Sequence, residues 1–258
     1  MDFGLAMYTV HKSAGKDLSG TCERLAETGY RGIEFFGDMT WDPKEIAYAI
    51  SSSGLAFTGW HIEWRDLQEN RIDETIAYLQ KSGCPIAVIP CLGGHWQIGH
   101  TQEEECREVW LSHFEKMVKI QAKLAENGIR CGYHNHAHEF QLSYDGKSLF
   151  EFIFDNLPDD MIIEFDSGNC IEGGEDPLPI LKKYRDRDMI LHMKPFSLRR
   201  SFDLVLGDED DENDWKKILD PKTKRYLFRL VESESTSLDE FENAKQCLKR
   251  AQELTKEL

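Results

Sequence analysis

Two hydrophobic rhythms alternate along the chain, a short β-branched or aromatic run and then a longer stretch in which apolar residues recur every 3.6 positions. The short runs predict eight strands, at Phe3–Val10, Gly32–Phe36, Ala56–Ile62, Ile86–Leu92, Arg130–His134, Met161–Phe165, Met189–Met193 and Tyr226–Val231. The longer stretches predict helices at Leu18–Thr28, Pro43–Ser53, Asp73–Ser82, Glu103–Asn127, Lys147–Leu157, Pro177–Tyr184, Asp214–Leu219 and Ser237–Leu254.

Residues that favour helix ends mark several of these boundaries. Glycine accepts the left-handed conformation that often ends a helix, and it stands at positions 29, 54, 83 and 128, each just before an expected strand. Two expected helices begin with an aspartate followed by proline, at Asp42-Pro43 and Asp176-Pro177. The boundaries therefore agree with the hydrophobic pattern.

Strands that alternate with helices pair in parallel through right-handed crossovers. Eight such units in 258 residues suit a sheet that closes on itself. The alternative, an open doubly wound sheet, usually carries a glycine-rich turn after its first strand, whereas this chain has His11-Lys12-Ser13-Ala14-Gly15 there. We therefore expect an α/β chain that folds as one (β/α)₈ TIM barrel over residues 1–258.

Charge and composition narrow the class of partner. The 47 acidic and 31 basic residues give a formal charge of −16, which opposes binding to nucleic acid and to anionic membranes. No apolar run approaches the roughly 20 residues of a membrane span, so a cytoplasmic protein is expected, with a removed leader left open. The cysteines, which we expect to be reduced, are scattered singly at Cys22, Cys84, Cys91, Cys106, Cys131, Cys170 and Cys247.

Candidate metal ligands stand at the ends of four consecutive expected strands. Asp166, His192 and Glu232 stand at the C-terminal ends of expected strands six, seven and eight, and His134 stands at the end of strand five. Catalytic groups of such barrels lie at the C-terminal ends of the strands, where the loops surround one mouth. Carboxylate and imidazole ligands suit Mn²⁺, Zn²⁺, Co²⁺ or Fe²⁺, so we expect one divalent metal there.

The same strand ends carry a resemblance to a known family. The motifs are Gly132-Tyr133-His134-Asn135-His136 with Glu139-Phe140, Phe165-Asp166-Ser167-Gly168-Asn169, Gly173-Gly174-x-Asp176-Pro177, Leu191-His192-Met193-Lys194 and Val231-Glu232. Together they resemble the sugar phosphate isomerase/epimerase family, the xylose-isomerase-like TIM barrels. The similarity runs from the first strand to the last helix.

The resemblance implies a single metal held by side chains of strands five to eight, with sugar hydroxyls completing its coordination. Asp166, His192 and Glu232 match the family's aspartate, histidine and final glutamate. Many relatives have a glutamate at the end of strand five, where this chain has Tyr133 and His134. The fourth ligand is therefore Glu139, which we favour, or one of His134 and His136, or else three side chains and water suffice.

The resemblance further implies an isomerase or epimerase that acts on a ketose, inosose or keto-sugar. Its metal would stabilise the enediolate formed when a proton leaves beside the carbonyl. The candidate acid and base residues are Glu139, Glu232, His134 and His136. A dehydratase, a keto-glycoside lyase and a non-catalytic sugar-binding barrel are alternatives, whereas a DNA-repair barrel of the endonuclease IV type is opposed by the −16 charge.

Other residues near the expected mouth suit a small sugar-like substrate. Aromatic rings pack against the C–H faces of sugars, and polar neighbours bind hydroxyls. The candidate substrate-binding residues are Tyr8, Trp60, His61, Glu63, Trp96, Asn169 and Lys194. Core packing is the alternative for Trp60 and Trp96, and an ordinary solvent-facing side chain is the alternative for Lys194. A homo-oligomer stays open, because association of such barrels leaves no short motif.

Overall fold

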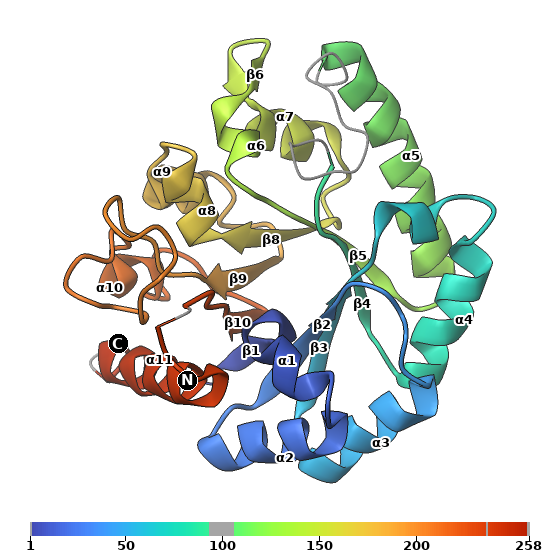
Figure 1. Ribbon diagram of the computed structural model, residues 1–258. Coiled ribbons are helices and arrows are strands. Elements are labelled where there is room, and N and C mark those ends of the chain that lie inside the picture. The colour runs from blue at the N-terminus through green and yellow to red at the C-terminus, as the bar shows by residue number, and fades with distance from the viewer. Residues whose placement is uncertain (1, 93–105, 236, 257–258) are drawn as a thin grey trace.

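A ring of eight parallel strands forms the centre of the computed structural model, which describes residues 2–92, 106–235 and 237–256 (Figure 1). The strands are β1 (Gly4–Ala6), β2 (Gly32–Phe36), β3 (Ala56–His61), β4 (Ile86–Ile89), β5 (Arg130–His134), β8 (Ile162–Asp166), β9 (Met189–Met193) and β10 (Phe228–Val231). Each strand pairs with the next along the chain, and β10 pairs with β1 to close the barrel. The predicted (β/α)₈ fold is therefore confirmed.

Helices cover the outside of this ring (Figure 1). The longer elements are α2 (Leu18–Thr28), α3 (Pro43–Ser53), α4 (Ile72–Ser82), α5 (Arg107–Glu126), α7 (Leu149–Asn156), α9 (Pro177–Lys183) and α11 (Glu240–Leu254), and α10 (Trp215–Ile218) is one turn. The predicted caps are confirmed, since the carboxylates of Asp42 and Asp176 accept from backbone N–H groups of α3 and α9. No helix among the described residues is both long and apolar enough to cross a membrane.

The hydrophobic pattern did not predict several short elements at the mouth of the barrel. They are η1 (Met7–Val10), α1 (His11–Ala14), η2 (Trp64–Leu67), α6 (His138–Gln141), α8 (Ser167–Glu172) and the hairpin of β6 (Ser143–Tyr144) with β7 (Lys147–Ser148). The first strand was predicted to reach Val10, which is wrong: it ends at Ala6, opposite Glu34 of β2, and the chain then winds into η1. The helix predicted from Lys147 begins at Leu149, because Lys147 pairs with Tyr144.

The two faces of the strands have different surroundings. Odd-numbered residues such as Ile163, Phe165 and Leu191 belong to the large core between the barrel and its helices. A small separate cluster fills the lumen, formed by Ile86, Val88, Ile162, Ile190 and Leu230. Because side chains alternate along a strand, the residues two further on point into the same lumen nearer its C-terminal end. On β8 and β9 these are Glu164 and His192, so the lumen turns from apolar to polar.

Gly168 permits the close approach of α8 to β9. A Cβ atom at this position would lie 2.5 Å from the carbonyl oxygen of Lys194. We therefore expect Gly168→Ala to lower the free energy of unfolding by about 1–3 kcal/mol, as overpacking does, measured by urea unfolding. The exposed Lys44→Ala on α3 is the control and should change it by less than about 0.5 kcal/mol. Equal stability of Gly168→Ala and wild type would contradict this packing argument.

Candidate active site

Four side chains converge at the C-terminal end of the lumen, three from β5, β8 and β9 and one from the residue that follows β10. They are His134, Asp166, His192 and Glu232, and each offers one ligand atom within 4.8 Å of the others. We call these residues the upper cluster. All four are buried, with exposed fractions of 7% or less. Asp166, His192 and Glu232 are three of the four residues predicted as metal ligands, the fourth being Glu139. His134 is one of the alternatives predicted for strand five.

The hydrogen bonds of the upper cluster leave acceptor atoms that suit a cation. Asp166 accepts from the backbone N–H of Asn169 with Oδ1 at 2.8 Å, so it also caps α8. Its other oxygen, Oδ2, is buried and has no hydrogen-bond partner among the described residues. A buried carboxylate oxygen without a partner is costly, and a bound divalent cation would satisfy it. Two carboxylates and two imidazoles also match the ligands of Zn²⁺ and related metals, so the residues fit a metal.

A second group lies beside the first and comes partly from the other side of the ring. Glu34 of β2, His61 of β3 and Glu164 of β8 form this lower cluster. The Nε2 atom of His61 is 2.5 Å from Oε2 of Glu164 and 3.3 Å from Oε2 of Glu34. Glu34 was missed from the sequence, although a lone carboxylate inside the apolar run Gly32–Phe36 was a usable signal.

His192 connects the two clusters. Its Nδ1 is 2.7 Å from Oε2 of Glu232, and its Nε2 is 2.8 Å from Oε2 of Glu34. The ring also stacks on His61, with centroids 5.5 Å apart. A histidine that binds a metal through one nitrogen carries its proton on the other, where a carboxylate commonly accepts it. Glu34 is placed to accept that proton and so to leave Nδ1 facing Glu232.

Burial and neighbouring charges shift the pKa of two carboxyl groups of the site upward and the pKa of two others downward. Burial raises the pKa of Glu164 to about 7, with further repulsion from Glu34. Burial likewise raises the pKa of Asp166 to about 7, where Lys194 opposes the shift and Glu232 adds to it. Burial acts in the same direction on Glu34 and Glu232, but neighbouring cationic groups outweigh it and hold the pKa of both well below the usual range.

The pKa values of the histidines at the site are also shifted in two directions. Burial disfavours the charged form of His61, yet the carboxylates of Glu164 and Glu34 prevail and raise its pKa to about 10. The same carboxylates raise the pKa of His192 against its burial. Burial, with cationic neighbours, lowers the pKa of His134 and His136 well below the usual value. The last two are therefore neutral at pH 7 and able to accept a proton or bind a metal.

Glu139 lies elsewhere. Its Oε1 accepts from the hydroxyl of Tyr133 at 2.7 Å, and its Oε2 accepts from the backbone N–H of His136 at 2.8 Å. Tyr133 belongs to the core outside the lumen, so its partner is drawn away from the upper cluster. Glu139 groups instead with Cys91 and His138, and burial raises its pKa. The structure therefore brings His134, and not the favoured Glu139, to Asp166, His192 and Glu232.

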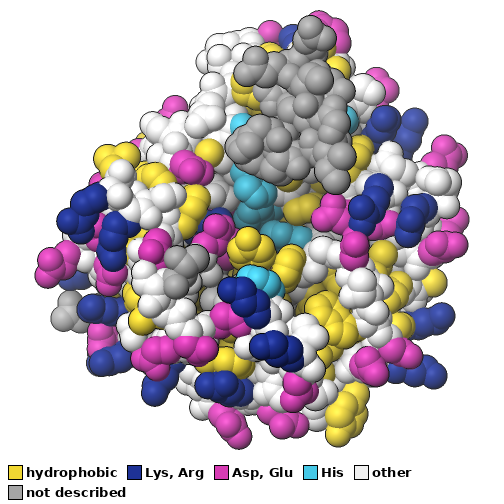
Figure 2. All heavy atoms as spheres, in the orientation of Figure 1, with side chains coloured by type: hydrophobic (Ala, Val, Ile, Leu, Met, Phe, Trp, Pro, Cys, Tyr) yellow, Lys and Arg dark blue, Asp and Glu magenta, His cyan; other side chains and the backbone are white. Residues whose placement is uncertain are grey.

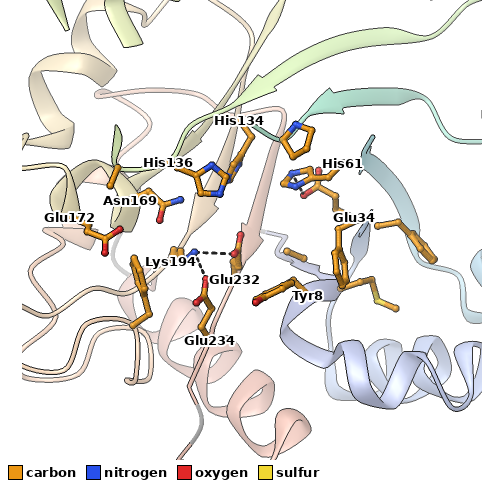
Figure 3. A pocket seen from close by; sticks show the side chains of 17 residues that line it. Tyr8, Glu34, His61, His134, His136, Asn169, Glu172, Lys194, Glu232 and Glu234 are labelled. Atoms are coloured by element: carbon orange, nitrogen blue, oxygen red, sulfur yellow. Dashed lines mark hydrogen bonds and ion pairs between the residues drawn. The ribbon is translucent and has the colours of Figure 1, made fainter. Parts of the chain in front are cut away.

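A pocket of about 380 Å³ opens above the clusters. Figure 2 shows histidine side chains within this hollow, and Figure 3 shows the residues around it. Among the predicted substrate-binding residues, Tyr8, His61, Asn169 and Lys194 line it, together with the predicted acid–base residues His134, His136 and Glu232. The sequence analysis missed Phe36, Glu172, Phe202 and Glu234, which also line it.

The remaining substrate-binding predictions have different outcomes. Trp60 does not reach the pocket, so its prediction is wrong and the core alternative holds. Its ring is fully buried, stacks on Phe35 at 5.0 Å and donates from Nε1 to the carbonyl of Gly37. Glu63 precedes η2 and is not among the described residues that line the pocket. Trp96 lies outside the described residues.

The closed ring and the polar groups at its mouth define a (β/α)₈ barrel with a candidate active site, and comparison with known proteins identifies its family. Residues 22–222 match the xylose isomerase-like TIM barrel, and the chain belongs to this family. The resemblance seen in the sequence is thereby confirmed.

The individual relatives share only a small part of their sequence with this chain. The inosose dehydratase of Geobacillus kaustophilus is 26% identical over 185 residues, which are 66% of this chain and 59% of that enzyme. The chain thus spans less than two thirds of that relative's length. A sugar phosphate isomerase/epimerase from Parabacteroides distasonis superposes with a TM-score of 0.78 at 21% identity, covering 99% of this chain and 95% of that one. L-ribulose 3-epimerase superposes with a TM-score of 0.68 at 15% identity, covering 98% and 94%. These two structural likenesses show the fold alone.

Proposed function

We propose that this chain is a divalent-metal-dependent isomerase or epimerase of a small ketose, inosose or keto-sugar. The observation that carries the proposal is the convergence of the four upper-cluster residues, two of which, His134 and Glu232, line the pocket. His134, Asp166, His192 and Glu232 would hold the metal. When bound there, a divalent cation would polarise a carbonyl and stabilise the negative charge that develops on its oxygen.

The chain's own residues supply the proton transfer. His136 lines the pocket. Burial lowers its pKa and so favours the neutral form of the imidazole, which is the form that a general base requires. Glu232 and Lys194 line the same pocket as His136 (Figure 3). A base on one face and a carboxylate on the other would allow a proton to leave from one side and return from the other. Glu139 does not line the pocket and would instead position His136, because its Oε2 accepts from the backbone N–H of that residue.

The second candidate function is dehydration or β-elimination on a related keto-sugar. The similarity to the inosose dehydratases supports it, because loss of water also begins with removal of a proton beside a carbonyl. The two functions differ in the fate of the intermediate: re-protonation gives an isomer, whereas departure of a β-oxygen gives an unsaturated product. A barrel that only binds sugar would perform neither step.

Proton abstraction is tested by hydrogen exchange. We expect the Mn²⁺-loaded protein, incubated in D₂O with a panel of ketoses, inososes and 3-keto-glycosides, to introduce deuterium at one carbon of at least one compound. Removing the metal with a chelator should slow the exchange at least about 100-fold, because the carbonyl is then no longer polarised. Proton and carbon NMR identify the labelled carbon and the product.

His136→Ala provides the test of the base. It should slow the exchange by about 10²–10⁴-fold, the usual contribution of a positioned base, while the bound metal remains. His11→Ala, a change of the same kind at an exposed histidine, is the control and should exchange at the wild-type rate. Sugar binding without any exchange would contradict the proposed chemistry and support the non-catalytic alternative.

A further inference from the structure

The loops that follow the last two barrel strands, β9 and β10, contribute several side chains to the wall of the pocket. In many TIM-barrel enzymes these loops form the phosphate-binding site of the active-site mouth. Here they supply Lys194 after β9 and Glu232-Ser233-Glu234 after β10. Two of these four side chains are carboxylates that line the pocket, and carboxylates repel a phosphate group.

Lys194 is engaged by both of those carboxylates. Its ammonium group is 3.1 Å from Oε1 of Glu232 and 2.5 Å from Oε1 of Glu234 (Figure 3). It also lies 4.5 Å from the centre of the Phe202 ring. Its side chain is only 4% exposed, which limits its reach toward a second anion. Glu234 is 32% exposed and stands on the open side of the pair.

Among the described residues that line the pocket, no second lysine and no arginine accompanies Lys194. The segment 93–105, which follows β4, contains neither lysine nor arginine in its sequence. A further carboxylate, Glu172 of α8, also lines the pocket (Figure 3). The charges of the described wall therefore disfavour an anionic substrate.

We propose that Glu234 determines charge specificity at this site: by pairing with Lys194 it excludes phosphorylated and other anionic sugars, so that the pocket accepts uncharged polyhydroxy compounds. This inference rests on the proposed function for the sugar-like nature of the substrate. The aromatic rings of Tyr8 and Phe36, which meet edge to face at 5.2 Å, offer an apolar wall for the C–H groups of such a compound. The carboxylates of Glu172 and Glu234 are suited to accept from its hydroxyls.

The test compares binding of matched pairs to the metal-loaded protein. The probes are D-fructose, D-tagatose and D-ribulose, each beside its terminal phosphate ester, and binding is measured by saturation-transfer NMR titration. In wild type we expect at least one free ketose to bind at least about tenfold more tightly than its phosphate ester. In Glu234→Gln the Kd ratio within that pair should shift about tenfold toward the ester, because the Lys194 ammonium group is then opposed by one carboxylate, Glu232, instead of two.

Glu175→Gln removes the same charge from an exposed position outside the pocket and should leave the ratio unchanged. Glu234→Ala, with folding checked by circular dichroism, should repeat the effect of the glutamine variant. Tighter binding of a phosphate ester by wild type, an unchanged ratio in both Glu234 variants, or absence of binding by every free ketose would each overturn the proposal. Binding that shows this selectivity without deuterium exchange would contradict the proposed chemistry alone and leave the charge specificity standing.

Discussion

Asp166→Asn is expected to abolish tight metal binding and to lower kcat/KM by roughly a thousandfold or more, about 4 kcal/mol of transition-state stabilisation. The amide retains an oxygen that can accept from the N–H of Asn169, so the cap of α8 survives. What disappears is the charge on Oδ2, the buried oxygen that has no hydrogen-bond partner among the described residues. Metal content by mass spectrometry and deuterium exchange at saturating Mn²⁺ measure the two effects.

A matched control separates the loss of the metal from the loss of a helix cap. Asp176 caps α9 through the N–H of Leu178 and is exposed. Asp176→Asn therefore makes the same chemical change at another capping aspartate and should leave both metal content and exchange rate near wild type. A stoichiometric metal in purified Asp166→Asn, held as tightly as in wild type, would rule out this residue as a ligand.

Glu34→Ala is expected to weaken metal binding by about 10–100-fold although Glu34 is not itself a proposed ligand. Without the carboxylate, Nε2 of His192 loses the acceptor at 2.8 Å that keeps its proton there. The imidazole can then place the proton on Nδ1, the nitrogen that faces Glu232. Metal affinity is measured by competition with a chelator, and the visible spectrum of the Co²⁺-loaded protein reports the ligand geometry.

The conservative variant Glu34→Gln keeps one acceptor oxygen and should restore part of the affinity lost in Glu34→Ala. Glu45→Gln, at an exposed position on α3, is the surface control. Glu34 could instead contribute only to packing. In that case both Glu34 variants would unfold at lower temperature while the metal Kd and the Co²⁺ spectrum stayed at their wild-type values.

Much of the fold could be predicted because its signals are local. The strands are runs of apolar residues, and the helix ends carry capping aspartates and glycines that act within one turn. The position of Asp166, His192 and Glu232 also followed, since the ends of parallel strands meet at one mouth once the barrel is assumed. These three residues required only the correct strand boundaries and the barrel geometry.

Trp60 shows what the pattern does not contain. The register between β2 and β3 shifts at Ile33, so that Ile33 pairs with Phe57 while Glu34 pairs with Gly59. This irregularity breaks the alternation of side chains along β3. Trp60 consequently lies opposite Phe35 in the outer core, and His61 points toward the lumen. A bulge of this kind depends on the pairing of two strands and leaves no mark in the composition of either.

The sequence did not indicate where the side chains of Glu139 and Glu34 lie, for two different reasons. Glu139 stands five residues beyond the end of β5, in the short helix α6. The direction of its side chain is fixed by the hydrogen bond that it accepts from the hydroxyl of Tyr133. Such a turn cannot be read from periodicity. Glu34 was passed over because it is surrounded by apolar neighbours in the sequence. Its partner His61 lies on the paired strand β3, and its partner His192 becomes a neighbour only when the ring closes.

The hydrogen bond between Glu34 and His192 links the N-terminal and C-terminal halves of the chain. Glu34 stands on β2, and β1 and β10 separate β2 from β9 around the ring. A fragment that ended after β4 would lack every residue of the upper cluster, and one that began at β5 would lack the acceptor for His192. Neither half-barrel could therefore reproduce the centre by itself, and a pair of halves that reassembled would recover it only by restoring both seams, β1 with β10 and β4 with β5.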